Sequence, residues 1–433
     1  MRAIILSIGD ELTLGQTLDT NSQWLSARLL ERSIIVLEHR TLADDRAAVA
    51  TAIRDSAARC DVLITTGGLG PTDDDLTREA LGDAISPGEA LVDDAQAREQ
   101  LQNWFTRRGR AMPVMNLRQA QRPRTFKCLP NPNGTAPGLA GAIGTCQVFC
   151  LPGPPREMQP MFENCVAAAL PSASGSVVLT AQVQEFGMGE SVAAEKLGDL
   201  MQRDRNPLVG TTASQSIVSA RIRAEGTPTW VREQIDATVQ RVRNAWHPYS
   251  FGEGDQPLAD VVGEMLAQRG LTLATAESCT GGWLGKAIVD RAGSSAYYLG
   301  GWVTYSNAMK MSQLNVRQEL LERHGAVSAE VARAMAEGAM RASGVDYALS
   351  ITGIAGPDGG SPEKPVGTVC IGAAFRSDTG TTHESQFQVR RFEFPGEREV
   401  IRDRSVKAAL QMLRFVLLGV SDTPLVWEVA RQA

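Results

Sequence analysis

Residues 62–75 read VLITTGGLGPTDDD: a short apolar run, a glycine-rich loop and three consecutive aspartates. The apolar run is typical of a buried strand, and a helical pattern follows the loop. Before this stretch, strand-like and helical patterns alternate along the chain, at residues 3–8, 22–31, 34–37 and 46–58. Such alternation predicts a parallel sheet with covering helices, which is an α/β fold.

The glycine-rich loop has the chemistry of an anion site. Glycines allow backbone N–H groups to close on an anion, and the N-terminus of a helix favours phosphate. The aspartates at 73–75 would repel such a ligand unless a cation lay between them, and Mg²⁺ suits oxygen ligands of this kind. A second loop, GDELTLG at 9–15, leaves the first strand at the same sheet edge, where α/β sheets bind ligands. The alternative is that the aspartates cap a helix and the glycines only make a turn.

The composition of the 433-residue chain excludes several classes of protein. A formal net charge of −6 argues against broad electrostatic binding of nucleic acid. We find no apolar stretch near the ~20 residues that span a bilayer, and no signal peptide. The seven cysteines are scattered without a CxxC pair, which indicates neither disulfides nor a zinc site. A cytoplasmic protein is expected. Cys279, beside Ser278, is the one candidate for a chemically exposed thiol, and its alternative is a small buried apolar residue.

Two stretches of small residues suggest three domains. We place the boundaries at PSASGS, residues 171–176, and at FGEGD, residues 251–255. The expected domains are residues 1–172, 173–252 and 253–421. The middle one reads strand, helix, strand, helix, at 177–186, 191–201, 216–224 and 229–245, and predicts a small α+β module.

A second candidate site lies in the last domain, where AESCTGG at 276–282 follows an apolar run and precedes a helical pattern. Ser278 at this strand-to-helix turn is a candidate nucleophile. Serine needs a base, and Lys310 is the candidate, because a lysine kept neutral by burial can accept the proton. None of the four histidines lies in these motifs, so a Ser–Lys pair is favoured over a Ser-His-Asp triad.

Further polar residues in this domain are candidates for substrate contacts. Thr352 precedes a glycine-rich loop at 353–360 that could wrap a phosphate, and Arg398 opens the last helix, where it could contact the same anion. Ser295 offers another hydroxyl, and Tyr305 could orient the base or a substrate ring. Each site residue has a structural alternative: Ser278 as a helix cap, Lys310 and Arg398 as surface residues, and Tyr305 as a core residue.

With these motifs in view, the chain resembles the CinA family over nearly its whole length. The matching segments are GDE at 9–11, TGGLGPT at 66–72, NGTAPG at 133–138, LPGPPREM at 151–158, AESCTGG at 276–282, TYSNAMK at 304–310 and GIAGPDGG at 353–360. The resemblance implies a molybdopterin-binding-like first domain, associated in this family with ADP-ribose pyrophosphatase activity. It further implies a KH-like connector and a C-terminal nicotinamide mononucleotide deamidase domain.

The resemblance also implies roles for individual residues. The catalytic set would be Ser278, Lys310, Tyr305 and Ser295. The substrate-binding set would be Gly281, Gly282, Thr352, Gly353 and Arg398. The N-terminal nucleotide site would contain Gly9, Asp10, Glu11, Gly67, Gly68, Gly70 and Thr72, with Asp74 and Asp75 as metal ligands.

The expected partners follow from the same resemblance. The substrates would be nicotinamide mononucleotide and ADP-ribose, and a homodimer is expected, with neither membrane nor nucleic acid as a partner. The deamidase would need no cofactor, whereas the N-terminal reaction would use a divalent Mg, Mn or Co ion. Asp73 stands where family members often have histidine, which puts the second reaction in doubt. The alternative is that the first domain only binds a nucleotide or pterin and regulates the deamidase.

Overall fold

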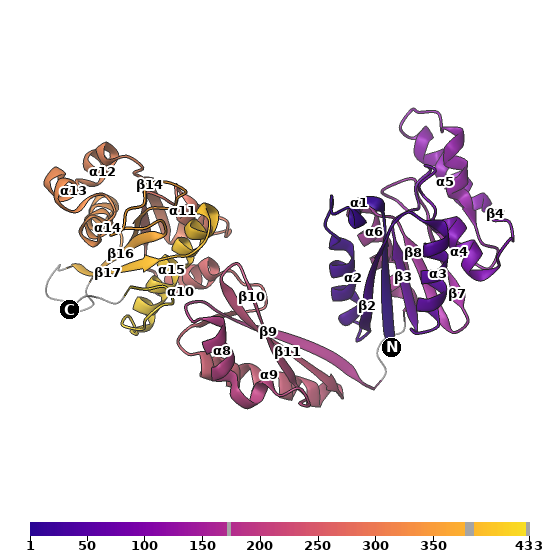
Figure 1. Ribbon diagram of the computed structural model, residues 1–433, viewed down its shortest axis with the longest axis horizontal. Helices are drawn as coiled ribbons and strands as arrows, with labels where there is room; N and C mark the ends of the chain where they lie inside the picture. The colour runs from indigo at the N-terminus through magenta and orange to yellow at the C-terminus, as the bar shows by residue number, and fades with distance from the viewer. Residues whose placement is uncertain (171–174, 377–384, 430–433) are drawn as a thin grey trace. The chain divides into compact units, whose positions relative to one another are not determined.

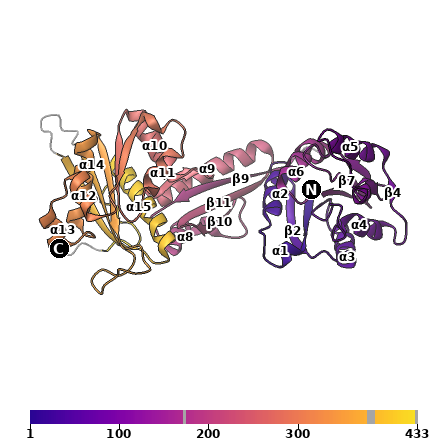
Figure 2. The same cartoon turned by 90° about the horizontal axis from the view of Figure 1, so that it is seen from above.

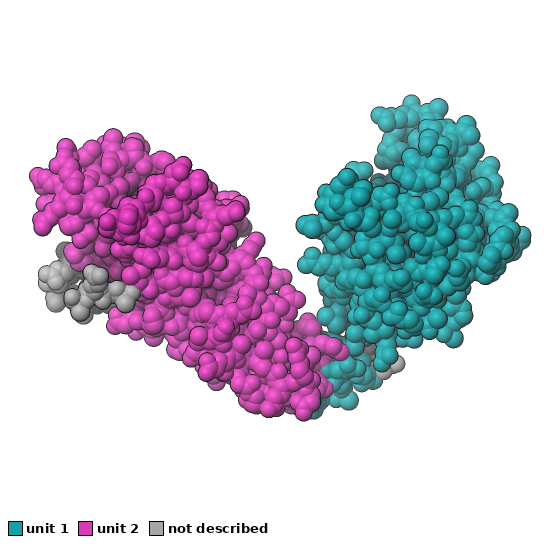
Figure 3. Space-filling model, in the orientation of Figure 1, with its two compact units in different colours: residues 1–179, 225–232 teal, residues 180–224, 233–433 magenta. Residues whose placement is uncertain are grey.

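The computed structural model of the chain describes residues 1–170, 175–376 and 385–429. Two compact units emerge from the packing of the backbone (Figure 3). The first contains Met1–Leu179 and Glu225–Arg232, and the second contains Thr180–Ala224 and Glu233–Ala433. The expected boundary at 172/173 lies outside the described residues.

The N-terminal region is built on a six-stranded sheet in the order β2-β1-β3-β8-β7-β6 (Figure 1). Its strands are β1 (Arg2–Ile8), β2 (Ile35–Leu42), β3 (Val62–Thr66), β6 (Lys127–Leu129), β7 (Gly138–Ile143) and β8 (Cys146–Leu151). The first four strands in the sheet are parallel, as predicted, but β7 is antiparallel to both of its neighbours. Only residues 144–145 join β7 to β8, which is too short for a crossover, so the sheet is mixed.

Helices cover both faces of this sheet. The helices are α1 (Asp10–Thr13), α2 (Thr20–Leu30), α3 (Arg46–Ala57), α4 (Thr77–Ile85), α5 (Ala95–Thr106), α6 (Pro155–Met161) and α7 (Ala167–Ala169), with a 3₁₀ turn at Val114–Ala120, a π turn at Phe162–Val166 and a short pair of strands, β4 (Val92–Asp93) and β5 (Gln121–Arg122). Apolar side chains of α2 and α6 form a core on one face, and those of α3 and α4 form a core on the other. The α/β class is therefore confirmed.

The parallel strands bring three loops to one edge of the sheet. Thr66 at the end of β3 pairs with Ser7 of β1 on one side and with Leu151 of β8 on the other. The loops that follow these strands begin at Gly9, Gly67 and Pro152. They therefore meet at the carboxyl edge, where open α/β sheets form ligand crevices.

The middle module is an antiparallel sheet in the order β10-β11-β9-β12, with α8 (Glu190–Leu197), a 3₁₀ turn at Gly198–Met201 and α9 (Pro228–Trp246) (Figure 2). Its strands are β9 (Val177–Glu185), β10 (Leu208–Ser214), β11 (Ile217–Gly226) and β12 (Ser250–Glu253). The sequence patterns predicted β9, β11 and both helices but missed β10 and β12. Residues 251–253, where a domain boundary was expected, belong to β12, because that strand pairs with β9.

The C-terminal domain has a five-stranded sheet in the order β14-β13-β15-β16-β17. Its strands are β13 (Leu273–Glu277), β14 (Tyr298–Val303), β15 (Tyr347–Gly353), β16 (Thr368–Arg376) and β17 (Ser385–Glu393). The strands β14, β13 and β15 are parallel, and β16 is antiparallel to both of its neighbours, β15 and β17. No helix in the described part of the chain is long and apolar enough to cross a membrane.

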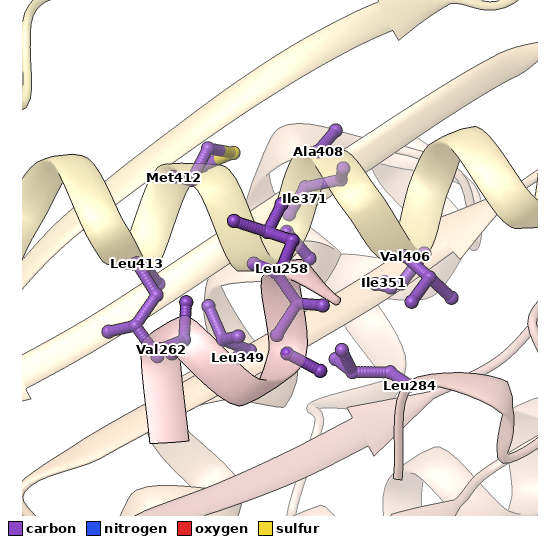
Figure 4. Close-up of a cluster of buried hydrophobic side chains, with 14 of the residues drawn as sticks. Leu258, Val262, Leu284, Leu349, Ile351, Ile371, Val406, Ala408, Met412 and Leu413 are labelled. Atoms are coloured by element: carbon purple, nitrogen blue, oxygen red, sulfur yellow. The ribbon is translucent and has the colours of Figure 1, made fainter. Parts of the chain in front are cut away.

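Two helical layers cover the C-terminal sheet. One contains α12 (Asn307–Leu314), α13 (Gln318–His324) and α14 (Ala329–Ser343), and the other contains α10 (Leu258–Arg269), α11 (Trp283–Val289) and α15 (Arg398–Leu418), while a 3₁₀ turn lies at Ser294–Ala296. Figure 4 shows the second layer, where Leu258 and Val262 of α10 and Leu413 of α15 lie in one buried cluster with Leu349 of the sheet. The sheet is thus buried on both faces, and its edge carries the loops.

Helix α15 also binds the middle module. Arg404 donates to Ser216 Oγ (2.8 Å), and Lys407 donates to the Gln215 carbonyl in the turn between β10 and β11. Gln411 donates to the carbonyl of Phe186 (2.8 Å), and Arg414 donates to that of Pro248 (2.6 Å). One face of a single helix therefore holds the module through four side chains.

Candidate functional site

Ser278 and Lys310 meet at the carboxyl edge of the C-terminal sheet. Ser278 directly follows β13, and its N–H donates to the Ile351 carbonyl of β15 (2.9 Å). Lys310 lies in the first turn of α12, which Ser306 caps by accepting from the Met309 N–H. The Lys310 Nζ atom is 3.1 Å from Ser278 Oγ and 2.9 Å from the Thr304 carbonyl oxygen.

The surroundings of Lys310 favour its neutral form. The side chain is only 1% exposed, and no carboxylate of the described residues lies within ion-pair distance of it. Burial lowers the pKa of the Lys310 ammonium below its ordinary value. Burial also raises the pKa of the neighbouring Cys279 thiol to about 12, so that this thiol stays uncharged. The pair therefore has the form of a hydroxyl nucleophile beside an amine base.

The turn that follows Ser278 is fixed by two residues that the sequence patterns did not single out. The buried Glu277 carboxylate accepts from three backbone N–H groups at the start of α11, those of Gly282, Leu284 and Gly285. Arg402 of α15 donates to the Thr280 carbonyl (2.7 Å). A carboxylate close before a helix start is a recognised stabiliser of that end, which is the signal that could have indicated Glu277.

The predicted Gly281 and Gly282 lie in this turn. Gly282 has a φ of 93° and is the N-cap of α11, a backbone conformation that residues with a Cβ rarely adopt. Its N–H is already bound by Glu277. Gly282 thus shapes the turn rather than offering a free donor to a substrate.

A pocket next to the turn is lined by Trp283, Arg398 and Arg402 and by the loop 355–357. Arg398 donates to the Gly356 carbonyl (2.8 Å) and to the Tyr305 hydroxyl (3.2 Å). Arg402 lies over the Trp283 ring at 5.0 Å. The structure thus brings Tyr305 and Arg398 together at a pocket whose lining includes two arginines, one aromatic face and two acidic residues, Glu397 and Glu399.

Thr352 and Gly353, which were predicted to contact the substrate, both lie within strand β15. Thr352 is buried at the end of β15, and its hydroxyl donates to the Ala326 carbonyl (2.8 Å), so this proton is not free for a substrate. Gly353 follows it as the last residue of the strand, paired with Val369 of β16. Both residues support the edge of the sheet beside the glycine-rich loop.

Ser295 does not reach Ser278 within the chain. It lies before β14, whose first residue pairs with Leu273 at the start of β13, whereas Ser278 follows the end of β13. Four residues of strand, roughly 13 Å, separate the two levels. The expectation that Ser295 assists Ser278 inside one chain is therefore corrected, because a position before a parallel strand lies at the opposite sheet edge.

A second pocket of about 420 Å³ lies at the carboxyl edge of the N-terminal sheet. Among its lining residues are those predicted for the nucleotide and metal sites other than Asp10, namely Gly9, Glu11, Gly67, Gly68, Gly70, Thr72, Asp74 and Asp75. At Gly67, with φ of 105°, a Cβ would come within 2.0 Å of the Ile8 carbonyl oxygen. Glycine there allows the two loops to touch, and this contact closes the pocket floor.

Asp75 has a structural function in this loop. Its carboxylate accepts from the N–H groups of Gly70 (2.7 Å) and Thr72 (2.9 Å) and from the Thr72 hydroxyl. The predicted anion cradle is therefore partly filled by the chain itself, and Asp75 does not fit the role of a metal ligand. The N–H groups of Gly68 and Leu69 have no partner among the described residues and remain available.

A buried arginine lies under the same loop. Arg78 is 1% exposed and donates to the carbonyls of Leu69 and Gly70. Burial lowers its pKa to about 10, so the side chain stays charged at neutral pH. This positive charge was not predicted from the sequence, because Arg78 reads there as an ordinary residue of an amphipathic helix.

Carboxylates gather at the mouth of the second pocket. Asp10 and Asp44 each accept from the other's backbone N–H. The pKa of Asp44 is raised, mainly by burial and then by the charges of Asp10, Glu11 and Asp74. Within the described ranges, no three His, Cys, Asp or Glu side chains form a group that could hold a metal ion.

Asp73, which stands at the position where the resemblance led us to expect histidine, points to solvent. Its carboxylate is fully exposed and lies 3.3 Å from Arg118, which also binds Glu79. Asp73 does not line the pocket. In this conformation it contributes to the surface of the loop.

Comparison with known proteins matches these regions one by one. The family model described as "CinA C-terminal domain" matches residues 255–417, "Damage-inducible protein CinA KH domain" matches 182–252, and "Probable molybdopterin binding domain" matches 4–172. A CinA-like protein of Dictyoglomus thermophilum is 38% identical over 421 residues, covering 97% of this chain and 100% of the relative. The chain belongs to the CinA family.

Another full-length relative shows a similar extent of similarity, and a solved structure matches a part of the chain. A CinA-like protein of Kosmotoga olearia is 38% identical over 419 residues and covers 96% of this chain and 99% of its own length. Among solved structures, the competence damage-inducible protein A from Klebsiella pneumoniae has 37% sequence identity over 37% of this chain and 95% of its own, with a TM-score of 0.35. The family resemblance inferred from the motifs is thus confirmed.

Proposed function

We propose that the C-terminal domain hydrolyses the carboxamide of nicotinamide mononucleotide and releases nicotinate mononucleotide and ammonia. The proposal rests mainly on one observation: the buried Lys310 amine lies 3.1 Å from Ser278 Oγ, and none of the described carboxylates lies within ion-pair distance of it. Membership of the CinA family supports a hydrolase. The carboxamide is a suitable target because a serine activated by a neutral amine can attack an acyl carbon.

The reaction would proceed in two halves. Lys310 takes the proton of Ser278 as Oγ attacks the carboxamide carbon, and the negative charge on the carboxamide oxygen is held by backbone N–H groups of the turn. Lys310 then gives its proton to the nitrogen, the C–N bond breaks and ammonia leaves. In the second half, Lys310 accepts a proton from water, which attacks the acyl-enzyme, and Ser278 recovers its proton on release of the acid.

The pocket beside the turn suits the nucleotide part of this substrate. Arg398 and Arg402 supply positive charge for a phosphate, and Trp283 offers an aromatic face for a flat ring. Tyr305 lies between this pocket and the base, because its hydroxyl contacts Arg398 and its carbonyl oxygen is 3.5 Å from Lys310 Nζ. Binding and chemistry would thus be carried by adjacent groups.

Arg398→Ala is expected to raise the KM for nicotinamide mononucleotide about 10- to 100-fold, the effect of losing a hydrogen bond to a charged group. The kcat should stay within about threefold, because the phosphate contact is the same in ground and transition states. Steady-state ammonia release measures both. Arg333→Ala is the matched control, since Arg333 pairs with Glu337 on α14, on the other face of the sheet. A fall in kcat with unchanged KM would contradict this role for Arg398.

We propose a second activity for the N-terminal pocket, the cleavage of the pyrophosphate of ADP-ribose to AMP and ribose 5-phosphate. The supporting observation is that free N–H groups of Gly68 and Leu69 and an acidic rim share one pocket, while the buried Arg78 lies under the same loop. Asp44, Asp74 and Glu11 line this pocket but do not form a metal group by themselves, so a divalent Mg, Mn or Co ion would have to be held jointly by these carboxylates and the pyrophosphate of the substrate. Such an ion, when bound, would neutralise charge on the pyrophosphate.

AMP release from ADP-ribose should depend on a divalent ion and on Asp74. We expect EDTA to abolish release by the full-length Ser278→Ala protein, and Asp74→Asn to lower it about 10-fold or more. Chromatography of the products with Mg²⁺, Mn²⁺ or Co²⁺ is the assay, and Asp83→Asn, which alters a carboxylate paired with Arg46 outside the pocket, is the control. Saturable ADP-ribose binding by calorimetry without AMP would instead indicate a domain that only binds and regulates.

A further inference from the structure

The Glu277 carboxylate organises the turn after Ser278. Glu277 is 2% exposed at the end of β13, and its two oxygens accept from the N–H groups of Gly282 (3.1 Å), Leu284 (3.0 Å) and Gly285 (2.8 Å). A buried carboxylate that accepts three amide bonds is strongly held. None of these three N–H groups is therefore free to contact a substrate.

Two of the other backbone N–H groups in this turn donate to no other described residue. Those of Ser278, Gly281 and Trp283 donate to the carbonyls of Ile351, Ser278 and Thr280. The N–H groups of Cys279 and Thr280 have no hydrogen-bond partner in any other described residue. Buried or half-buried backbone donors are nearly always paired, so two adjacent free ones next to a nucleophile indicate a site for an anion.

The carbonyl side of the turn is also fixed. Arg402 donates to the Thr280 carbonyl, and the bond from the Gly281 N–H to the Ser278 carbonyl (3.0 Å) closes a four-residue turn. Cys279 and Thr280 are the two central residues of this turn, and the closing bond uses neither of their N–H groups. The Thr280 hydroxyl is buried and likewise has no partner among the described residues.

We propose that Glu277 is a positioning residue for Ser278, and that the N–H groups of Cys279 and Thr280 receive the negative charge that develops during the attack. The proposal rests on the deamidase function proposed above. Glu277 acts through the turn and touches neither substrate nor Lys310. By binding the three following amides it sets the direction of the two that remain.

Glu277→Gln tests the positioning role with little change in shape. A glutamine retains one accepting oxygen, but its NH₂ group would face an amide N–H, so the start of α11 must shift. We expect kcat for ammonia release to fall about 100-fold with KM within about threefold, because small misplacement of catalytic groups acts on the transition state. Glu277→Asp, which keeps the charge but is shorter by one methylene, is the second variant should the first fail to fold.

Asp346→Asn is the matched control. The Asp346 carboxylate accepts from the Thr272 N–H (2.8 Å) and from the Thr272 hydroxyl (2.7 Å). Thr272 directly precedes β13, the strand that ends at Glu277. The Asp346→Asn change should lower the melting temperature, measured by circular dichroism, about as much as Glu277→Gln does, and it should leave kcat unchanged. A kcat for Glu277→Gln within threefold of wild type, or equal losses in both variants, would overturn the proposal.

Labelling of Ser278 by an alkyl fluorophosphonate separates this proposal from the deamidase function. Ser278 Oγ forms a bond to phosphorus, fluoride leaves, the serine proton goes to Lys310, and the phosphoryl oxygen needs the same two N–H donors. Intact-mass measurements should show labelling about 100-fold slower in Glu277→Gln than in wild type or Asp346→Asn. Labelling of wild type without ammonia release would refute the deamidase function alone, and unchanged labelling of Glu277→Gln would refute the positioning role alone. Neither labelling nor ammonia release by wild type would refute both.

Discussion

Ser278→Ala is expected to reduce ammonia release from nicotinamide mononucleotide about 10⁴-fold or more. Removal of a serine nucleophile leaves only binding and charge stabilisation, and in other serine hydrolases this costs several orders of magnitude. Ser278 is only 9% exposed, and its N–H, which continues the ladder to β15, is unaffected by the change. The fold should therefore persist, with an unchanged circular dichroism spectrum.

Ser343→Ala provides the comparison for this result. Ser343 lies at the end of α14, and its hydroxyl donates to the Ala339 carbonyl of the same helix. Activity of this variant should match that of wild type. If Ser278→Ala released ammonia within tenfold of the wild-type rate, Ser278 would not be the nucleophile and the covalent mechanism would be excluded.

Lys310→Met is expected to lower kcat about 10³-fold, within the range for loss of a general base. Methionine fills a similar volume without a titratable group. Lys310→Arg should be equally inactive, because a guanidinium stays charged and cannot accept the serine proton. Lys286→Met is the control, since Lys286 lies exposed on α11 and pairs with Asp290. Retained activity in Lys310→Arg would exclude a neutral amine base.

The pH profile gives an independent check on the same base. Burial lowers the pKa of Lys310 from the ordinary 10.5, and only the neutral amine can take the serine proton. The kcat/KM should therefore rise with pH through a pKa below 10.5 that belongs to the free enzyme. In Lys310→Met this limb should be missing from any residual activity, and a wild-type profile without a rising limb would contradict the mechanism.

The pairing of Ser278 with Lys310 was predictable because both lie in short motifs at the ends of recognisable elements. Glu277 and Arg402 were not, since their function depends on which N–H and carbonyl groups the folded turn leaves unpaired. Ser295 was misplaced because the sequence motif does not say at which end of β14 it lies. The order and direction of the strands decide which loops meet at one edge of a sheet, and the sequence pattern does not give this order.

The first domain shows the same division. The alternation of patterns predicted the strands β1, β2 and β3 and the helices between them, because β1 and β3 are continuous buried apolar runs and the helices bury a regular apolar face. The reversal of β7 depends on a two-residue connection, and the function of Asp75 depends on the curvature of the loop before it. In the middle module, β10 and β12 were missed because their exposed residues alternate weakly with apolar ones.

The position of helix α15 determines where the arginines of the pocket lie, and this position depends on contacts outside the pocket. Arg398 and Arg402, at its first turns, supply the pocket's positive charge, while the bonds of Arg404, Lys407, Gln411 and Arg414 to the middle module fix its register. A slip of this helix by one residue would rotate its side chains through about 100° and would carry both arginines away from the pocket. None of the residues that line this pocket comes from the described part of the middle module. Its hydrogen bonds to α15 nevertheless keep Arg398 and Arg402 in position.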